Sequence, residues 1–215
     1  AVEHDTMDTT FRSMYLGLSA FLDANTERRE LLLGQRPPRF DSSFDEAIAL
    51  TGDDFERVAL KAESARDYFL LVGPPGTGKT SRALRRMVEH FYAASSMQIL
   101  LLAYTNRAVD EICQSLSSIT PCIDYIRVGS ELSCDVRFRG HLLENILAEC
   151  NSRREVNIRM ADCRVYVGTV ASIAAKAELF KLKRFDVAIV DEATQILEPQ
   201  LLGILCAKFA DERNA

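Results

Sequence analysis

The sequence lacks the residue patterns that hold metal centres and extracellular folds together. It has no tryptophan, three histidines and six cysteines among 215 residues. No two cysteines form a Cys-x-x-Cys pair, and no histidine stands at zinc-finger spacing from one, so a zinc or iron–sulfur site is not expected. The thiols at positions 113, 122, 134, 150, 163 and 206 are therefore interpreted as reduced and mostly buried.

Long apolar runs are missing as well. No stretch approaches the roughly 18 residues of a membrane span, and no secretory signal precedes Phe11. We therefore predict no membrane partner and a cytoplasmic location of bacterial or nucleoid-associated type, with a nuclear location left open. The composition, 47% hydrophobic and 27% charged, is that of a folded chain with one large domain, or one domain and an appendage.

Charge is unevenly distributed along the chain. The net charge is −5, but residues 1–70 carry 8 basic and 14 acidic side chains, whereas residues 71–215 carry 18 and 17. A binding site for nucleic acid would therefore have to be local and to lie in the second part.

Periodicity divides the chain into a helical beginning and an alternating remainder. Apolar residues at steps of three and four predict a helix over 8–24, and a second helix follows to Leu33. The segment 34–39 contains two prolines and breaks helicity, so we assign residues 1–40 as a helical stalk or linker and 41–215 as the main domain. Helices are also predicted over 44–50, 55–66, 81–94, 108–116, 141–150, 172–180 and 199–207.

Short apolar runs alternate with these helices and predict strands. They are Tyr68–Val72, Gln98–Tyr104, Tyr125–Val128, Arg164–Val167 and Asp186–Val190. Continuous apolar strands that alternate with helices predict an α/β fold, with a parallel sheet covered by helices on both faces. Residues 118–163 are polar and irregular, so little is predicted for them.

One segment matches the phosphate-binding loop G-x-x-x-x-G-K-[S/T] between a predicted strand and a predicted helix, which is the context that this motif requires. Glycines allow backbone N–H groups to wrap phosphates, and the helix N-terminus adds a positive dipole end. Lys79 would bridge the β- and γ-phosphates and Thr80 would bind Mg²⁺. The predicted nucleotide-binding residues are Gly73, Pro74, Pro75, Gly76, Thr77, Gly78, Lys79 and Thr80; the alternative is a glycine turn with a solvated lysine.

The strand predicted at Asp186–Val190 ends in the acidic pair Asp191-Glu192. Adjacent carboxylates at the end of a buried strand are costly unless they face a cleft or a cation. In a P-loop NTPase, Asp191 would hold Mg²⁺ and Glu192 would activate the attacking water. The alternative is a strand end with two solvated acids. No Asn-Lys-x-Asp guanine reader is present, and the acidic pair favours ATP hydrolysis over transfer to a small molecule.

Together these segments resemble the first RecA-like motor domain of superfamily 1 helicases, in the branch that holds the nonsense-mediated-decay RNA helicase and the replication helicase–nuclease. Besides the phosphate loop, Leu101–Asp110 resembles motif Ia and Val167–Ser172 resembles motif Ic. Asp191–Gln195 resembles motif II, and Arg28–Phe40 resembles the stalk that precedes the motor.

The resemblance implies that Thr105, Asn106 and Thr169 contact the phosphates of a single strand. The alternative is that Thr105 or Asn106, and likewise Thr169, cap the helices that follow. The partners implied are single-stranded nucleic acid, with DNA favoured over RNA by the stalk, and a second RecA-like domain. The implied function is ATP- and Mg²⁺-dependent translocation or unwinding. The alternative is an ATP-switched nucleic-acid- or protein-binding module. A clamp-loader-type ring ATPase lacks support from Thr105, Asn106 and Thr169.

The sequence departs from the family pattern at two places. Phe55 stands where the family has a glutamine that reads adenine, so base selectivity is left open, with Tyr68 as an alternative stacking residue. The motif III segment and the second domain are expected beyond Ala215, so the motor domain is expected to be incomplete. Since an arginine finger contributes about 10³–10⁵ in rate, we expect these 215 residues alone to bind nucleotide weakly and hydrolyse it very slowly.

Overall fold

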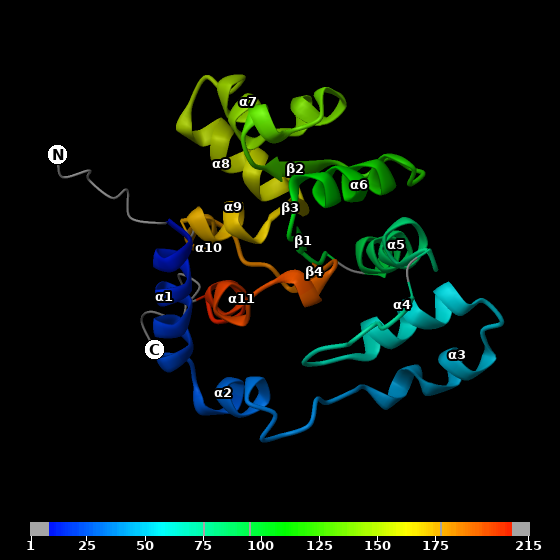
Figure 1. The fold of residues 1–215 in the computed structure, drawn as a ribbon. Coiled ribbons are helices and arrows are strands. Elements are labelled where there is room, and N and C mark those ends of the chain that lie inside the picture. Colours follow the sequence, from blue (N-terminus) through cyan, green and yellow to red (C-terminus); the bar gives the residue numbers. More distant parts are fainter. Residues whose placement is uncertain (1–8, 75, 95, 177, 208–215) are drawn as a thin grey trace.

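Four parallel strands form the centre of the molecule. The computed structural model describes residues 9–74, 76–94, 96–176 and 178–207. Strands β1 (Ile99–Ala103), β2 (Tyr125–Val128), β3 (Val165–Thr169) and β4 (Val187–Val190) lie in the order β2-β3-β1-β4, and every pairing is parallel (Figure 1). All four strands lie where the sequence predicted them.

Side chains that alternate along β1 divide the core into two halves. Ile99, Leu101 and Ala103 pack on one face with the helices α4 (Asp54–Ser64), α5 (Arg85–Ala94) and α6 (Asn106–Ser117). Leu100 and Leu102 pack on the other face with residues of α7–α11. These helices are α7 (Leu143–Ala148), α8 (Arg153–Asp162), α9 (Val170–Ala175), α10 (Leu179–Leu182) and α11 (Glu198–Leu205). Helices therefore cover both faces of a parallel sheet, which confirms the predicted α/β fold class.

The N-terminal helices lie beside and below this core in the view of Figure 1. They are α1 (Thr9–Leu22), α2 (Thr26–Leu32) and α3 (Asp45–Leu50). Helix α1 packs against α11 through Gly17, where an added Cβ would stand 2.0 Å from the carbonyl oxygen of Pro199. The predicted apolar face of α1 is mostly not the packed one, because Phe11 and Tyr15 are 69% and 74% exposed.

The strand predicted at Tyr68–Val72 is wrong. This run has no strand pairing, and Leu70 and Val72 are 75% and 93% exposed. The chain at and after the end of α4 instead forms backbone hydrogen bonds with residues 39–41. The N–H of Asp41 donates to the carbonyl of Ser64, and the N–H of Arg66 donates to that of Arg39.

A buried carboxylate strengthens this attachment. The side chain of Asp67 accepts hydrogen bonds from the guanidinium groups of Arg36, at 2.8 and 2.9 Å, and of Arg39, at 3.0 and 3.1 Å. Asp67 directly precedes the run at 68–72, which pairs with no strand, and the outer edge of β4 has no strand partner among the described residues.

The region 118–163 contains a helix that the sequence did not predict. Helix α8 begins after Ser152, whose hydroxyl accepts from the N–H of Glu155, while the Glu155 carboxylate accepts from the N–H of Asn151. Within α8 only Met160 is buried, so the helix carries no apolar stripe and gives no periodic signal. Short turns at Glu131–Ser133 and Val136–His141 complete this region, and the helix predicted over 141–150 is formed only as α7.

Candidate nucleotide-binding site

The glycine-rich turn between the exposed run and α5 has the backbone of a phosphate cradle. Gly76 and Gly78 have φ values of +80° and +82°, which residues with a side chain rarely adopt. The helical turn Lys79–Leu84 follows directly, and the N–H of Ala83 reaches back five residues to the carbonyl of Gly78 at 3.0 Å. Such wide turns are rare and are frequently found at functional sites. Pro75, a predicted binding residue, lies outside the described residues.

The lysine of the motif closes the turn on itself. Lys79 Nζ donates to the carbonyl oxygens of Gly73 at 2.6 Å and Pro74 at 2.9 Å, and Thr77 Oγ1 donates to the same Pro74 oxygen at 2.8 Å. The ammonium group is therefore positioned over the loop and is held by neutral acceptors. Anionic phosphate oxygens would be stronger acceptors for the same group.

Two residues that are 111 positions apart in the chain meet beside this turn. Thr80 Oγ1 donates to Asp191 Oδ2 at 2.5 Å. The N–H of Asp191 donates to the carbonyl of Leu102 at 2.8 Å, so the residue continues the line of β4 along the sheet. The sheet and the phosphate loop together therefore bring this hydroxyl and this carboxylate within reach of one common cation.

The donor set fits magnesium. Mg²⁺ prefers oxygen ligands and is usually held by one or two protein groups, with phosphates and water completing its shell. Thr80 and Asp191 supply two such oxygens. Within the described part of the chain, no group of three His, Cys, Asp or Glu side chains could hold a metal ion by itself, so the pair at the loop offers a shared site and not a closed protein cage.

The next residue, Glu192, has a strained backbone. Its φ of +51° is the one positive value at a non-glycine position in the described residues, and such conformations cost about 1–3 kcal/mol and concentrate at functional sites. Its side chain is exposed and accepts a hydrogen bond from Gln195 Nε2 at 2.7 Å. Gln195 was not predicted as a site residue, although its three-residue spacing from Glu192 is compatible with this contact.

The three residues predicted to contact nucleic acid lie at the ends of β1 and β3. Thr105 Oγ1 caps α6 by accepting from the N–H of Ala108 at 3.1 Å, and Thr169 Oγ1 caps α9 by accepting from that of Ser172 at 3.0 Å. Thr105 is exposed, Asn106 is half-buried and Thr169 is 5% exposed. The capping alternative is therefore realised for both threonines, and contacts with a strand stay a prediction.

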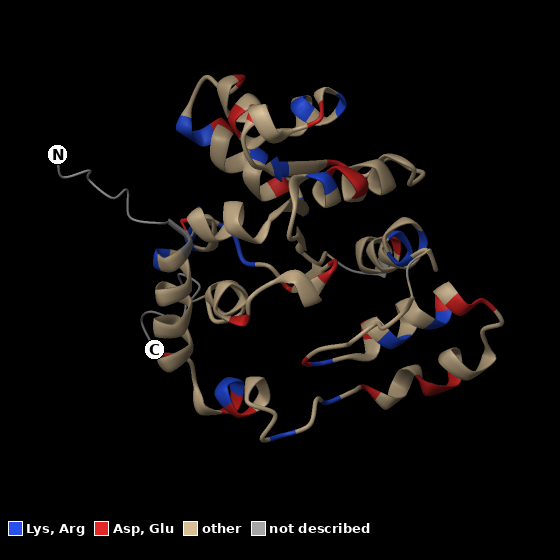
Figure 2. Ribbon diagram, viewed as in Figure 1, with Lys and Arg blue, Asp and Glu red and all other residues tan. Residues whose placement is uncertain are grey.

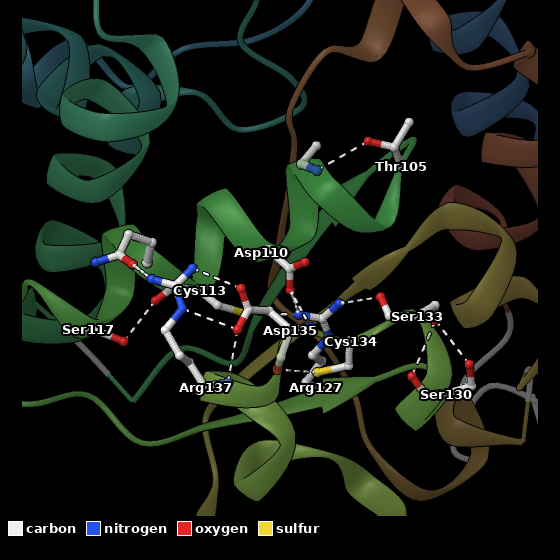
Figure 3. A network of polar contacts seen from close by, with 12 residues as sticks. Thr105, Asp110, Cys113, Ser117, Arg127, Ser130, Ser133, Cys134, Asp135 and Arg137 are labelled. Carbon is white, nitrogen blue, oxygen red and sulfur yellow. Dashed lines mark hydrogen bonds and ion pairs between the residues drawn. The ribbon is translucent and has the colours of Figure 1, made fainter.

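Sequence reasoning missed a buried ion pair beneath this edge. Arg127 of β2 is 1% exposed; its guanidinium pairs with Asp110 of α6 and donates to the carbonyl of Ser133 at 3.4 Å (Figure 3). Arg137 adds a second link, since it donates to Asp135 and Gln114. A charged residue within an otherwise apolar predicted strand was the available signal.

A shallow groove of about 420 Å³ lies over this network. It is lined by Thr80 and Ser81 of the phosphate-loop helix, by α6 and by residues 135 and 137. Basic and acidic residues are mixed along the elements of the molecule (Figure 2), and the groove lining repeats this mixture with two arginines and three carboxylates. A uniformly basic path for a phosphate backbone is not present in this groove.

The parallel sheet, the phosphate loop and the acidic strand end define a P-loop nucleotide-binding domain. A family described as AAA domain matches residues 56–212, which is well over half of the chain. The chain belongs to this family, and it is a RecA-like domain of the superfamily 1 helicase type.

Three curated relatives illustrate the match. DNA replication ATP-dependent helicase/nuclease JHS1 of Arabidopsis thaliana is 31% identical over 212 residues, covering 94% of this chain and 15% of that protein. DNA replication ATP-dependent helicase/nuclease DNA2 of Homo sapiens is 28% identical over 193 residues, covering 82% and 18%. Putative ATP-dependent RNA helicase ECM32 of Saccharomyces cerevisiae is 28% identical over 211 residues, covering 80% and 18%. The chain thus spans less than a fifth of the length of these relatives. None of its described helices has the length and apolarity to cross a bilayer.

Proposed function

We propose that the phosphate loop binds ATP with Mg²⁺, and that hydrolysis there drives movement along a nucleic acid. The observation that carries this proposal is the contact between Thr80 Oγ1 and Asp191 Oδ2 at 2.5 Å. It joins the two oxygens that a metal beside a loop-bound triphosphate needs, from segments far apart in the chain.

Each residue of the site has a role that its geometry supports. The backbone N–H groups of the glycine turn would wrap the phosphates, and Lys79 would exchange two carbonyl acceptors for β- and γ-phosphate oxygens. Thr80 and Asp191 would hold Mg²⁺, which supplies charge neutralisation on the transferring phosphoryl group when bound. Glu192 would take a proton from the attacking water, with Gln195 Nε2 orienting its carboxylate.

The nucleic acid would lie across the edge where β1 and β3 end. Thr105, Asn106 and Thr169 are the proposed contacts. The names of JHS1 and DNA2 refer to DNA replication and that of ECM32 to RNA, and the higher identity to JHS1 supports DNA as the preferred strand. We also propose residues 1–40 as a stalk, 41–215 as the ATP-binding domain, and a second RecA-like domain as the partner that completes the site.

The binding half of the proposal is tested on the 215-residue chain. Replacement Lys79→Ala removes hydrogen bonds to a charged group, so the Mg²⁺-ATP dissociation constant should rise about 10–100-fold. Isothermal titration calorimetry measures the constant, and Lys61→Ala on the exposed side of α4 is the matched control. Equal ATP affinity for Lys79→Ala and wild type would contradict the proposal.

The catalytic half needs two measurements of phosphate release. The 215 residues alone should turn over very slowly, because the proposed second RecA-like domain would supply the arginine that completes the site. A longer protein with that domain should be stimulated by single-stranded DNA, and more strongly than by RNA of the same sequence. Rapid Lys79-dependent hydrolysis by the isolated chain would contradict the first expectation. An ATP-dependent change in DNA affinity without stimulated turnover would favour the switch module instead of a motor.

A further inference from the structure

An aromatic ring and a guanidinium group are stacked between α4 and the helical turn that follows the phosphate loop. The guanidinium carbon of Arg82 lies 4.2 Å from the ring centroid of Phe55. Arg82 belongs to the helical turn that follows Lys79, and Phe55 belongs to the first turn of α4. Phe55 is half-buried and Arg82 is exposed, so the pair offers a flat, cationic group at the surface.

The stack and the proposed metal site lie on different sides of the helical turn Lys79–Leu84. Thr80 is directed to Asp191 on β4, whereas Arg82, two residues later, is directed to Phe55 on α4. The two side chains therefore leave this wide helical turn towards different elements, β4 and α4. A triphosphate whose terminal end lies at Thr80 would therefore extend its nucleoside end towards the stack.

Two carboxylates close to Phe55 in the sequence already have hydrogen-bond partners. The carboxylate of Asp53 caps α4 by accepting from the N–H groups of Phe55 at 2.8 Å and Glu56 at 3.3 Å. The carboxylate of Glu56 accepts from Arg86 at 2.7 Å and contacts His90 at 2.7 Å. Residues 51–57 contain no asparagine or glutamine, so this segment lacks the paired donor and acceptor of a side-chain amide, which is what matches the N6 and N7 edge of adenine.

We propose that Phe55 and Arg82 form a stacking platform that contacts the plane of the nucleobase and not its edge, so that purine and pyrimidine nucleoside triphosphates bind this site with similar affinity. This proposal rests on the proposed nucleotide-binding function and extends its substrate from ATP to nucleoside triphosphates in general. Stacking on an aromatic ring tolerates every base because every base has a π-face, and a guanidinium adds cation–π attraction.

The test compares ATP, GTP, CTP and UTP, each with Mg²⁺, by displacement of a fluorescent ADP from the whole chain. Inorganic tripolyphosphate is the base-free probe. Wild type should bind the four nucleotides within about fivefold of each other. Replacement Phe55→Ala or Arg82→Ala should weaken all four by about 5–150-fold, the range reported for loss of one stacking contact, and leave tripolyphosphate unchanged.

Two further variants sharpen the result. Phe55→Gln should create an adenine preference, because an amide can pair with N6 and N7 of adenine. Tyr68→Ala is the matched aromatic control, and its four affinities should equal those of wild type. The inference is overturned if Tyr68→Ala loses affinity while Phe55→Ala does not, or if Phe55→Ala loses tripolyphosphate affinity in parallel.

Failure of this inference differs from failure of the proposed function. Tight ATP binding with GTP, CTP and UTP weaker by more than about 100-fold, well beyond one stacking contact, overturns the base-indifferent site and leaves the ATPase proposal intact. Absence of binding by every nucleotide and by tripolyphosphate, in wild type as in Lys79→Ala, overturns both.

Discussion

Similar apolar runs differ in burial between the inner strands of the sheet and the region of its β4 edge. Strands β1, β2 and β3 are buried at every position, whereas β4 is partly exposed and Ala188 is open to solvent. Beyond β4, the run Tyr68–Val72 pairs with no strand. An apolar run is therefore not sufficient to form a strand, since Tyr68–Val72 stays unpaired although the outer edge of β4 is open among the described residues.

The phosphate loop does not need the missing strand to keep its turn. Its shape is set locally, by the positive φ values of Gly76 and Gly78 and by the hydrogen bonds of Lys79 and Thr77 to the loop carbonyls. The site is therefore anchored on one side by β4 through Asp191, and on the other by contacts inside the loop.

The largest expected change in the free energy of unfolding comes from a buried residue of the inner strand β1. Leu101→Ala removes a side chain with 0% exposure and should lower the free energy of unfolding by about 2–5 kcal/mol. Leu70→Ala, the same change in the exposed run, should alter it by less than about 0.5 kcal/mol. Urea denaturation followed by circular dichroism measures both. A comparable loss for Leu70→Ala would show that Tyr68–Val72 is buried in solution and would remove the contrast.

A smaller effect is expected from the buried ion pair that joins β2 to α6. Asp110→Asn leaves the Arg127 guanidinium without its anionic partner in a buried position, and should cost about 3 kcal/mol. The double variant Asp110→Leu, Arg127→Met should recover most of this loss, because it removes the charge along with its partner. If Asp110→Asn unfolds at the wild-type urea concentration, the pair makes no net contribution.

The smallest of these effects concerns Asp67, which attaches the chain before the unpaired run at 68–72 to Arg36 and Arg39. Hydrogen bonds from Arg36 and Arg39 lower the pKa of Asp67 well below its usual range. A lowered carboxyl pKa stabilises the fold above the unfolded-state pKa of about 3.9, and this contribution is lost as the pH falls towards the folded-state pKa.

Asp67→Asn should therefore lower stability at pH 7 by about 1–2 kcal/mol, and the difference from wild type should shrink progressively below about pH 4. Asp23→Asn, on the exposed turn after α1, is the matched control. A wild-type–variant difference that is constant from pH 7 to pH 3 would mean that the Asp67 charge is not what holds the two segments together.

The sequence predicted correctly those features that depend on residues close together in the chain. The four strands of the sheet, the glycine turn and the acidic strand end all follow from short patterns. Helix α8 was missed because its only buried residue is Met160, and a helix with one apolar contact has no period to detect. Arg127 was missed because its partner, Asp110, lies 17 residues away and no local pattern connects them.

By itself, the sequence determined a parallel α/β sheet, a phosphate loop and a carboxylate pair, because backbone conformation and continuous apolar runs depend on residues that are close in the chain. Only the tertiary structure decided that Thr80 meets Asp191, that α1 packs through Gly17 and not its apolar face, and that Tyr68–Val72 stays outside the sheet. These outcomes depend on which surfaces are free when distant segments come together. Arg36 and Arg39 bind Asp67 just before the run at 68–72, and no local pattern predicts that contact.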